Sequence, residues 1–95
     1  MFDLSGRAVV VTGGNGGIGL GMARALAEAG ADIAIWARDE DRNGAAVGQL
    51  AYGDSYEAGD RRIIACPCDV SSEESVEAAM ARTLEMLGHV DCLIA

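Results

Sequence analysis

The chain has 95 residues, 51% of them hydrophobic, so its length allows one small domain with a modest core. Fifteen acidic residues stand against seven arginines and no lysine, and the net charge of −8 excludes nucleic-acid binding through a basic surface. No stretch approaches the roughly 18 apolar residues that span a bilayer, so we expect neither membrane insertion nor an export signal.

The first predicted element is a strand over about residues 7–12, because Ala8 to Val11 are apolar and mostly β-branched. From Gly17 onward the apolar residues recur at helical spacing, which predicts a helix over about 17–29 that ends at Gly30. We expect one apolar face of this helix to hold the residues that share the spacing: Ile18, Met22, Ala25, Leu26 and Ala29.

The middle of the chain predicts a second strand over Asp32 to Ala37, which completes a right-handed βαβ unit with the preceding strand and helix. A helix over 39–51 follows, with Asp39 as its candidate N-cap. Residues 52–60 are predicted to form a loop, and residues 61–67 a third strand.

The last part of the chain predicts a third helix and a fourth strand. A capping box of Ser71 and Glu74 opens the helix, Gly88 closes it, and the strand covers residues 90–95. The apolar residues at helical spacing in this helix are Val76, Ala79, Met80, Thr83, Leu84 and Leu87.

The predicted order of elements is βαβαβαβ. This order is typical of the α/β fold class and predicts a Rossmann-type doubly wound parallel sheet, here incomplete, with strand order 3-2-1-4. Such a unit is one mononucleotide-binding half of the doubly wound fold.

A glycine-rich turn joins the first strand to the first helix. Gly14, Gly16 and Gly19 fit the pattern G-x-G-x-x-G, with the strand before it and the helix after it that this pattern requires. Backbone N–H groups and the positive end of the helix are then directed at a phosphate, and side chains in the turn would block the pyrophosphate. A P-loop is excluded, because no Lys-Ser or Lys-Thr pair follows the glycines.

The same turn also has the spacing Thr12-Gly13-x-x-x-Gly17-x-Gly19, and Thr12 and Gly13 stand where the first strand should end. This spacing resembles the fingerprint of the short-chain dehydrogenase/reductase family, and the layout of residues 2–95 is similar to that family's N-terminal part throughout. The resemblance implies that the chain binds NADP or NAD through the turn. The residues it assigns to the cofactor there are Gly13, Asn15, Gly16, Gly17, Ile18 and Gly19.

The end of the second strand bears on the choice of cofactor. The position of an NAD-type aspartate corresponds to Ala37, which leaves room, and Arg38 follows with a guanidinium that can pair with a 2′-phosphate. This favours NADP. Two readings remain open beside it, because Asp39 can reach the ribose itself and Arg38 can be a solvated arginine. The family's NADP-preferring members often carry a basic residue at the position that Gly16 occupies here.

A third signal follows the third strand. Asp69 and Val70 resemble the family's Asp-Val pair, which sits beside the adenine ring. A carboxylate can accept a hydrogen bond from the adenine amino group, and a valine can cover the ring face. The alternative is that Asp69 simply helps to start the next helix.

The resemblance also implies what these 95 residues lack. Family members transfer hydride between a nicotinamide and an alcohol or carbonyl, using a serine and a Tyr-x-x-x-Lys pair. The chain has no lysine, so neither Tyr52 nor Tyr56 fits, and we assign no catalytic residue. The family's Asn-Ala-Gly motif would begin directly after Ala95.

We therefore expect residues 1–95 to be the N-terminal dinucleotide-binding half of a Rossmann domain, truncated after the fourth strand and inactive alone. The small-molecule alcohol or carbonyl substrate, and the homo-oligomer that the resemblance implies, belong to the full-length protein.

The cysteines give no metal signal. Cys66 and Cys68 are too close for an ordinary disulfide, Cys92 makes the count odd, and His89 is the only histidine. We expect free thiols, no metal site and a cytoplasmic protein.

Two other functions compete with the oxidoreductase reading. One is a non-catalytic nucleotide-binding module. The other is a doubly wound domain that binds S-adenosylmethionine, against which Arg38 argues, because the ribose of that cofactor usually pairs with a carboxylate.

Overall fold

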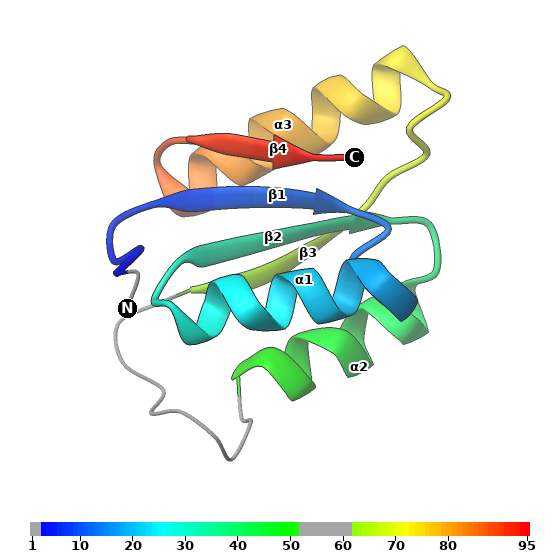
Figure 1. Ribbon diagram of the computed structural model, residues 1–95. Coiled ribbons are helices and arrows are strands. Elements are labelled where there is room, and N and C mark those ends of the chain that lie inside the picture. Colours follow the sequence, from blue (N-terminus) through cyan, green and yellow to red (C-terminus); the bar gives the residue numbers. More distant parts are fainter. Residues whose placement is uncertain (1–2, 52–61) are drawn as a thin grey trace.

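The computed structural model describes residues 3–51 and 62–95 of the chain. Four parallel strands form one sheet in the order β3-β2-β1-β4, which confirms the predicted fold class and strand order (Figure 1). The elements are β1 (Ala8–Thr12), α1 (Gly17–Glu28), β2 (Asp32–Ala37), α2 (Glu40–Ala51), β3 (Ile63–Pro67), α3 (Glu73–Leu87) and β4 (Cys92–Ile94). The predicted loop over 52–60 lies outside the described residues.

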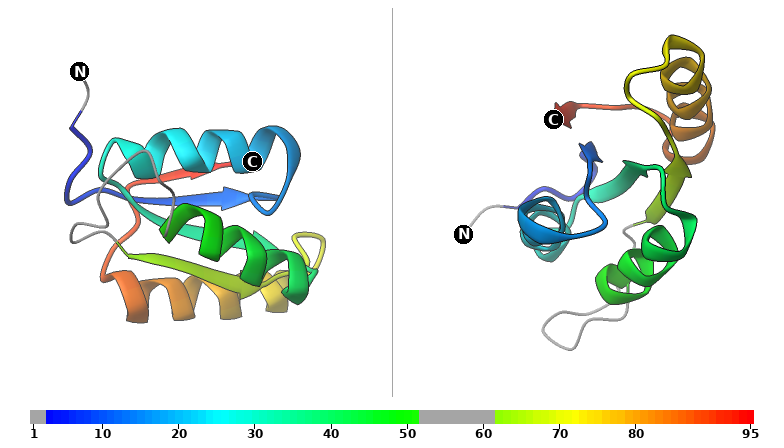
Figure 2. Two further views of the ribbon diagram at one scale, coloured as in Figure 1. Left: turned by 90° about the horizontal axis from the view of Figure 1, so that it is seen from below. Right: turned by 90° about the vertical axis from the view of Figure 1, so that its right-hand side faces the viewer.

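The sheet is covered on both faces, as the apolar runs predicted. Val9 and Val11 of β1 pack with α1 and α2, whereas the intervening Val10 packs with α3. Figure 2 shows α3 on the opposite face of the sheet from the other two helices. Because side chains alternate along a strand, burial on both faces requires the continuous apolar sequence that β1 and β2 have.

The predicted apolar face of α1 is wrong in part. Ile18 is 84% exposed and Met22 and Ala25 are exposed as well, whereas the helix buries Ala23 and Ala27. These two alanines are four residues apart, so they lie on one face and let the helix backbone approach the sheet closely. Of the predicted face, Leu26 is partly buried against the core.

The start of α3 also differs from the prediction. Ser72, not Ser71, is the N-cap, and its Oγ accepts a hydrogen bond of 3.3 Å from Ser75 N. The capping box of Ser71 and Glu74 is therefore wrong by one residue. The helix ends as predicted at Gly88, whose φ of +87° suits glycine. Leu84 is 44% exposed, although its spacing placed it on the apolar face.

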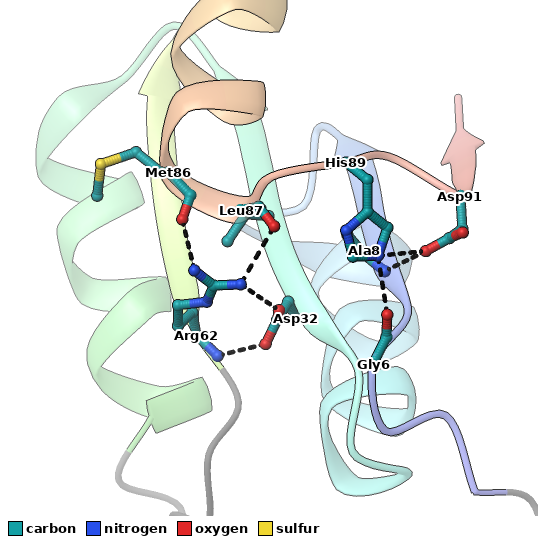
Figure 3. Close-up of polar contacts among 8 residues, drawn as sticks. All are labelled: Gly6, Ala8, Asp32, Arg62, Met86, Leu87, His89 and Asp91. Carbon is teal, nitrogen blue, oxygen red and sulfur yellow. Dashed lines mark hydrogen bonds and ion pairs between the residues drawn. The ribbon is translucent and has the colours of Figure 1, made fainter.

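The fourth strand begins at Cys92 rather than at residue 90. The side chain of the preceding Asp91 binds the start of β1. Its Oδ2 accepts a hydrogen bond of 2.8 Å from Ala8 N, and His89 Nε2 lies 3.0 Å from the same oxygen and donates to Gly6 O (Figure 3). The Ala8 N–H lowers the pKa of Asp91, with smaller contributions from the charges of His89 and Arg7. The carboxylate thus fastens the start of β4 to the start of β1.

A second polar contact fastens α3 to the sheet. Arg62 donates from its backbone N to Asp32 Oδ1 (2.6 Å) and from its guanidinium to Asp32 Oδ2 and to the carbonyl oxygens of Met86 and Leu87 (Figure 3). These are the last two residues of α3, where carbonyl oxygens lack helical partners. Arg62 lies directly before β3, which begins at Ile63 instead of the predicted residue 61.

A buried hydrogen-bond chain links β2 to α3. Trp36 Nε1 donates to Thr83 Oγ1 (3.0 Å), and that hydroxyl donates to Ala79 O (2.7 Å). The Trp36 and Thr83 residues are at most 1% exposed, so water does not replace a lost partner.

Thr83→Val keeps the shape of the side chain but leaves the indole N–H of Trp36 without an acceptor. We expect the free energy of unfolding to fall by about 1–3 kcal/mol, the cost of an unsatisfied buried donor. Urea denaturation followed by the fluorescence of Trp36 measures it. Thr83→Ser keeps the hydroxyl and is expected to lose less; a valine variant as stable as the wild type would contradict the role of this bond.

Candidate functional site

The candidate site lies where the carboxyl ends of the parallel strands meet. The chain leaves β1 and adds β2 and β3 on one side, and then crosses to add β4 on the other side of β1. The order of the strands therefore reverses next to β1. In open α/β sheets, ligands bind at the carboxyl edge beside such a reversal.

The glycine turn after β1 has a backbone that other residues adopt with difficulty. Gly13 and Gly17 have φ angles of +69° and +57°, and Gly13 N donates to Trp36 O over 2.9 Å, which holds the turn against β2. A Cβ on Gly19 would lie 2.5 Å from Gly13 O, so only glycine permits this contact. The chain thus passes close to itself and leaves the turn without side chains at these points.

The turn leads directly into the N-terminus of α1. Gly16 is the N-cap, no side chain caps the helix, and no acidic residue lies in its first turn. The first N–H groups of a helix have no partner within it, and the helix dipole adds positive potential there. This end of α1 therefore suits an anion, and Ile18 lies exposed at the same end.

A pocket of about 480 Å³ lies beside the turn, at the ends of β1, β2 and β3. This volume is in the range of small-molecule sites. Four of the residues predicted from the sequence to bind the cofactor at the ends of β2 and β3 line it, and the full lining is Thr12, Gly13, Trp36, Ala37, Arg38, Cys68, Asp69, Val70 and Ser71.

Asp69 lies both at the turn into α3 and in the lining of the pocket. Its carboxylate accepts hydrogen bonds from Ser71 Oγ (2.6 Å) and Ser71 N (3.0 Å), and its carbonyl oxygen accepts one from Ser72 N (2.9 Å). It therefore helps to form the turn into α3 and lines the pocket as well. The Ser71 hydrogen bonds and, to a smaller extent, the charge of Arg38 lower the pKa of Asp69.

The side chain of Asp39 is engaged at the start of α2. Its Oδ1 accepts a hydrogen bond from Arg42 N (3.1 Å), which confirms the predicted N-cap. Arg38 is the exposed charged residue at the end of β2 that lines the pocket.

One residue at the site was missed by the sequence prediction. Asn43 is 3% exposed; its Oδ1 accepts from Asn15 Nδ2 (2.9 Å) and its Nδ2 donates to Ala37 O (2.8 Å). It thus ties the glycine turn to the end of β2 through α2. A signal was present, because Asn43 precedes the buried Ala46 and Leu50 by three and seven residues and so shares their face.

The predicted site residues fall into two groups. Those of the glycine turn lie between β1 and the first turn of α1, and those at the ends of β2 and β3 line the pocket. Asn15 hydrogen-bonds Asn43 and supports the turn, and Gly16 caps α1.

Cys66 and Cys68 are buried free thiols and Cys92 is an exposed one. Within residues 3–51 and 62–95, no three His, Cys, Asp or Glu residues gather as a metal site, and no helix is long and apolar enough to cross a membrane.

The parallel sheet, the glycine turn and the uncapped helix behind it define a nucleotide-binding α/β domain. Comparison with known proteins specifies the class further. The model of the short chain dehydrogenase family matches residues 7–95. The chain therefore belongs to the short-chain dehydrogenase family.

Individual relatives agree with this assignment. The chain is 37% identical over 90 residues to the L-fucose dehydrogenase of Bos taurus. The match covers 95% of this chain and 30% of that protein. Among solved structures, it is similar to 3-ketoacyl-(acyl-carrier-protein) reductase from Brucella melitensis complexed with NADH (32% identity, TM-score 0.81, covering 96% of this chain and 34% of that one).

It is also similar to L-sorbose reductase from Gluconobacter frateurii complexed with NADPH and L-sorbose, at 33% identity and a TM-score of 0.84. This match covers 97% of the chain and 33% of that protein. The chain thus spans about a third of the length of the proteins that it matches.

Asn43→Leu removes both hydrogen bonds that join the turn to the end of β2 and leaves Asn15 Nδ2 without this partner. We expect the free energy of unfolding to fall by about 1–3 kcal/mol, as measured by urea denaturation. Gln49→Leu is the matched control, since Gln49 is exposed on the same helix, and its effect should stay within about 0.5 kcal/mol. Equal stability of the two variants would show that Asn43 does not hold the site together.

Proposed function

We propose that residues 1–95 are the dinucleotide-binding half of a short-chain oxidoreductase and that they bind NADP in preference to NAD. The observation that carries this proposal is the uncapped N-terminus of α1, which lies behind the glycine turn beside the pocket that Arg38 lines. One end of the site suits a pyrophosphate, and the other holds a base and a ribose.

The residues present fit such a cofactor. Gly13, Gly17 and Gly19 keep the turn free of side chains, as the positive φ angles and the contact with Gly13 O require. The N–H groups that follow Gly16 hold the pyrophosphate, and Ile18 covers the cofactor at the exposed end of α1.

The adenine is placed in the pocket at the ends of β2 and β3. Asp69, ionised and oriented by Ser71, accepts from the adenine amino group. Val70 is 61% exposed, and its apolar surface covers the ring. This apolar surface becomes buried when the cofactor binds.

The preference for NADP depends on the end of β2. An NAD-type site places a carboxylate on the ribose 2′-hydroxyl, and this chain has Ala37 there. Asp39, the nearest carboxylate along the chain, already accepts from Arg42 N as the N-cap of α2. Arg38 therefore meets the ribose without a competing carboxylate at the carboxyl end of β2, and a guanidinium suits a 2′-phosphate.

When bound, the cofactor supplies hydride exchange with a small-molecule alcohol or carbonyl. The chain supplies no acid-base pair for that step, because it has no lysine, and Tyr52 and Tyr56 lie outside the described residues. We therefore assign residues 1–95 to cofactor binding alone and expect no turnover from them in isolation. The full-length protein would be a cytoplasmic homo-oligomer that carries its catalytic residues elsewhere in the chain.

Arg38→Ala tests the cofactor preference. We expect NADPH to bind at least about tenfold more weakly to this variant, because a charge-assisted hydrogen bond to the 2′-phosphate is lost, while NADH binding changes little. Isothermal titration calorimetry of the protein at its natural length measures the affinity for each cofactor. Equal weakening of both cofactors would return Arg38 to the role of a solvated arginine.

A further inference from the structure

The strand β3 has an outer edge that no strand of the described residues covers. It is the last strand of the sheet, at the edge away from β4, and Figure 2 shows α2 on one face of it and α3 on the other. Before its first residue, Arg62 O accepts a hydrogen bond from Ile33 N over 2.9 Å. After its last residue, Cys68 N donates to Ala37 O over 3.1 Å. Because backbone groups alternate in direction along a strand, the residues that face away from β2 are the odd-numbered ones in between: Ile63, Ala65 and Pro67.

The position of Pro67 agrees with this direction. Proline has no N–H, so within a sheet it stands where no partner strand needs a donor. Pro67 is exposed, and its missing N–H falls on the outer edge of β3. The edge therefore offers the N–H and C=O groups of Ile63 and Ala65 and the carbonyl oxygen of Pro67. Backbone groups with this spacing are those that an added strand bonds.

A groove of about 350 Å³ lies beside this edge, between β3 and α2. Glu40, Gly44 and Val47 form its wall, because residues that are four and three apart share one face of a helix. A Cβ on Gly44 would meet no atom within 4 Å, so the glycine leaves this space open. The described lining is Glu40, Asn43, Gly44, Val47, Ala65 and Pro67.

The polar groups of the groove define the chemistry of its occupant. The Asn43 amide is engaged at both ends, by Asn15 and by Ala37 O. Of the described lining residues Glu40 alone is charged, and no ion pair of 4.0 Å or less within the described part of the chain engages it. Glu40 begins α2 beside the end of β2, where Ala37 pairs with Pro67. An occupant therefore meets an anion at the Pro67 end of the groove and apolar surface along the rest.

Charge favours a basic segment of another protein over a second copy of this chain. The 95 residues carry a net charge of −8, so two copies repel each other as their edges approach. Pairing of two β3 edges would also set Pro67 of each copy against a carbonyl group that it cannot serve as a donor. A short extended peptide needs only the groups that the edge has.

We propose that the outer edge of β3 and the groove beside it bind an extended peptide segment of a partner protein, which adds to the sheet as a strand and carries a basic side chain beside Glu40. In the antiparallel arrangement, which is the more stable per residue, the peptide residues opposite Pro67, Ala65 and Ile63 share the α2 face with them. The recognised motif is therefore basic-x-apolar-x-apolar, beginning at Pro67. The surface lies outside the cofactor pocket, so the proposal does not depend on the proposed function.

The test measures binding of a synthetic peptide, acetyl-Lys-Thr-Val-Thr-Ile-amide with a fluorescein label, to the protein at its natural length. Fluorescence anisotropy should give a dissociation constant of about 10–500 µM. Glutamate in place of the lysine should weaken binding about fivefold, because it meets Glu40 with a like charge. A methyl group on the valine nitrogen removes the donor for Ala65 O and should weaken binding at least about tenfold, whereas methylation of the first threonine nitrogen, which points away from β3, should change it less than about twofold.

Two pairs of protein variants locate the site. Gly44→Leu fills the groove and should weaken peptide binding at least about tenfold, with no fall in the urea midpoint of unfolding, because leucine favours a helix more than glycine does. Gly48→Leu is the matched control: a Cβ there also meets no atom within 4 Å, and Gly48 is not among the described lining residues.

Glu40→Lys should weaken binding of the lysine peptide at least about fivefold. Asp41→Lys makes the same charge change in the same helical turn, outside the described lining, and should have an effect of less than about twofold.

Three outcomes would overturn the inference. The first is no peptide binding up to about 1 mM, a free energy of about −4 kcal/mol. The second is equal weakening by Gly44→Leu and Gly48→Leu, which would place the peptide elsewhere. The third is a change of oligomeric state with Gly44→Leu in sedimentation velocity without peptide binding, which would assign the edge to a second copy. NADPH binding, measured separately by calorimetry, tests the proposed function independently of all three.

Discussion

The structure depends on the close approach of the chain to itself at the glycine turn. Gly19 in the first turn of α1 lies so near Gly13 O that a Cβ would come within 2.5 Å of it. This contact lets α1 begin directly above the end of β1, with Ala23 and Ala27 against the sheet. The helix end is left uncapped at the carboxyl edge, so the residues that pack the fold also leave free the N–H groups that we propose bind the pyrophosphate.

The second helix completes what the turn begins. Asp39 starts α2, Asn43 ties it to Asn15 and to Ala37 O, and Arg42 lies between these contacts against Gly16. The interior of α2 contains Gly44 and Gly48, which disfavour a helix, and polar contacts to the site fix its first turn.

The sequence predicted the fold well, because apolar runs and glycines are local signals. The strand order, the positive φ at Gly30 and Gly88, and the N-cap at Asp39 all follow from residues near in the chain. What escaped prediction depends on contacts between distant segments. The sequence around Asn43 indicates that its side chain is buried, but not that it contacts Asn15, 28 residues earlier in the chain. The burial of small alanines in α1 depends on how closely the helix approaches the sheet.

The most direct test of this account is a crystal structure of the protein at its natural length with NADPH bound. The account predicts the pyrophosphate on the N–H groups that follow Gly16, the adenine between Asp69 and Val70, and the 2′-phosphate within hydrogen-bond distance of Arg38. A dinucleotide bound at another edge of the sheet, or a 2′-phosphate that faces solvent away from β2 and α2, would contradict it.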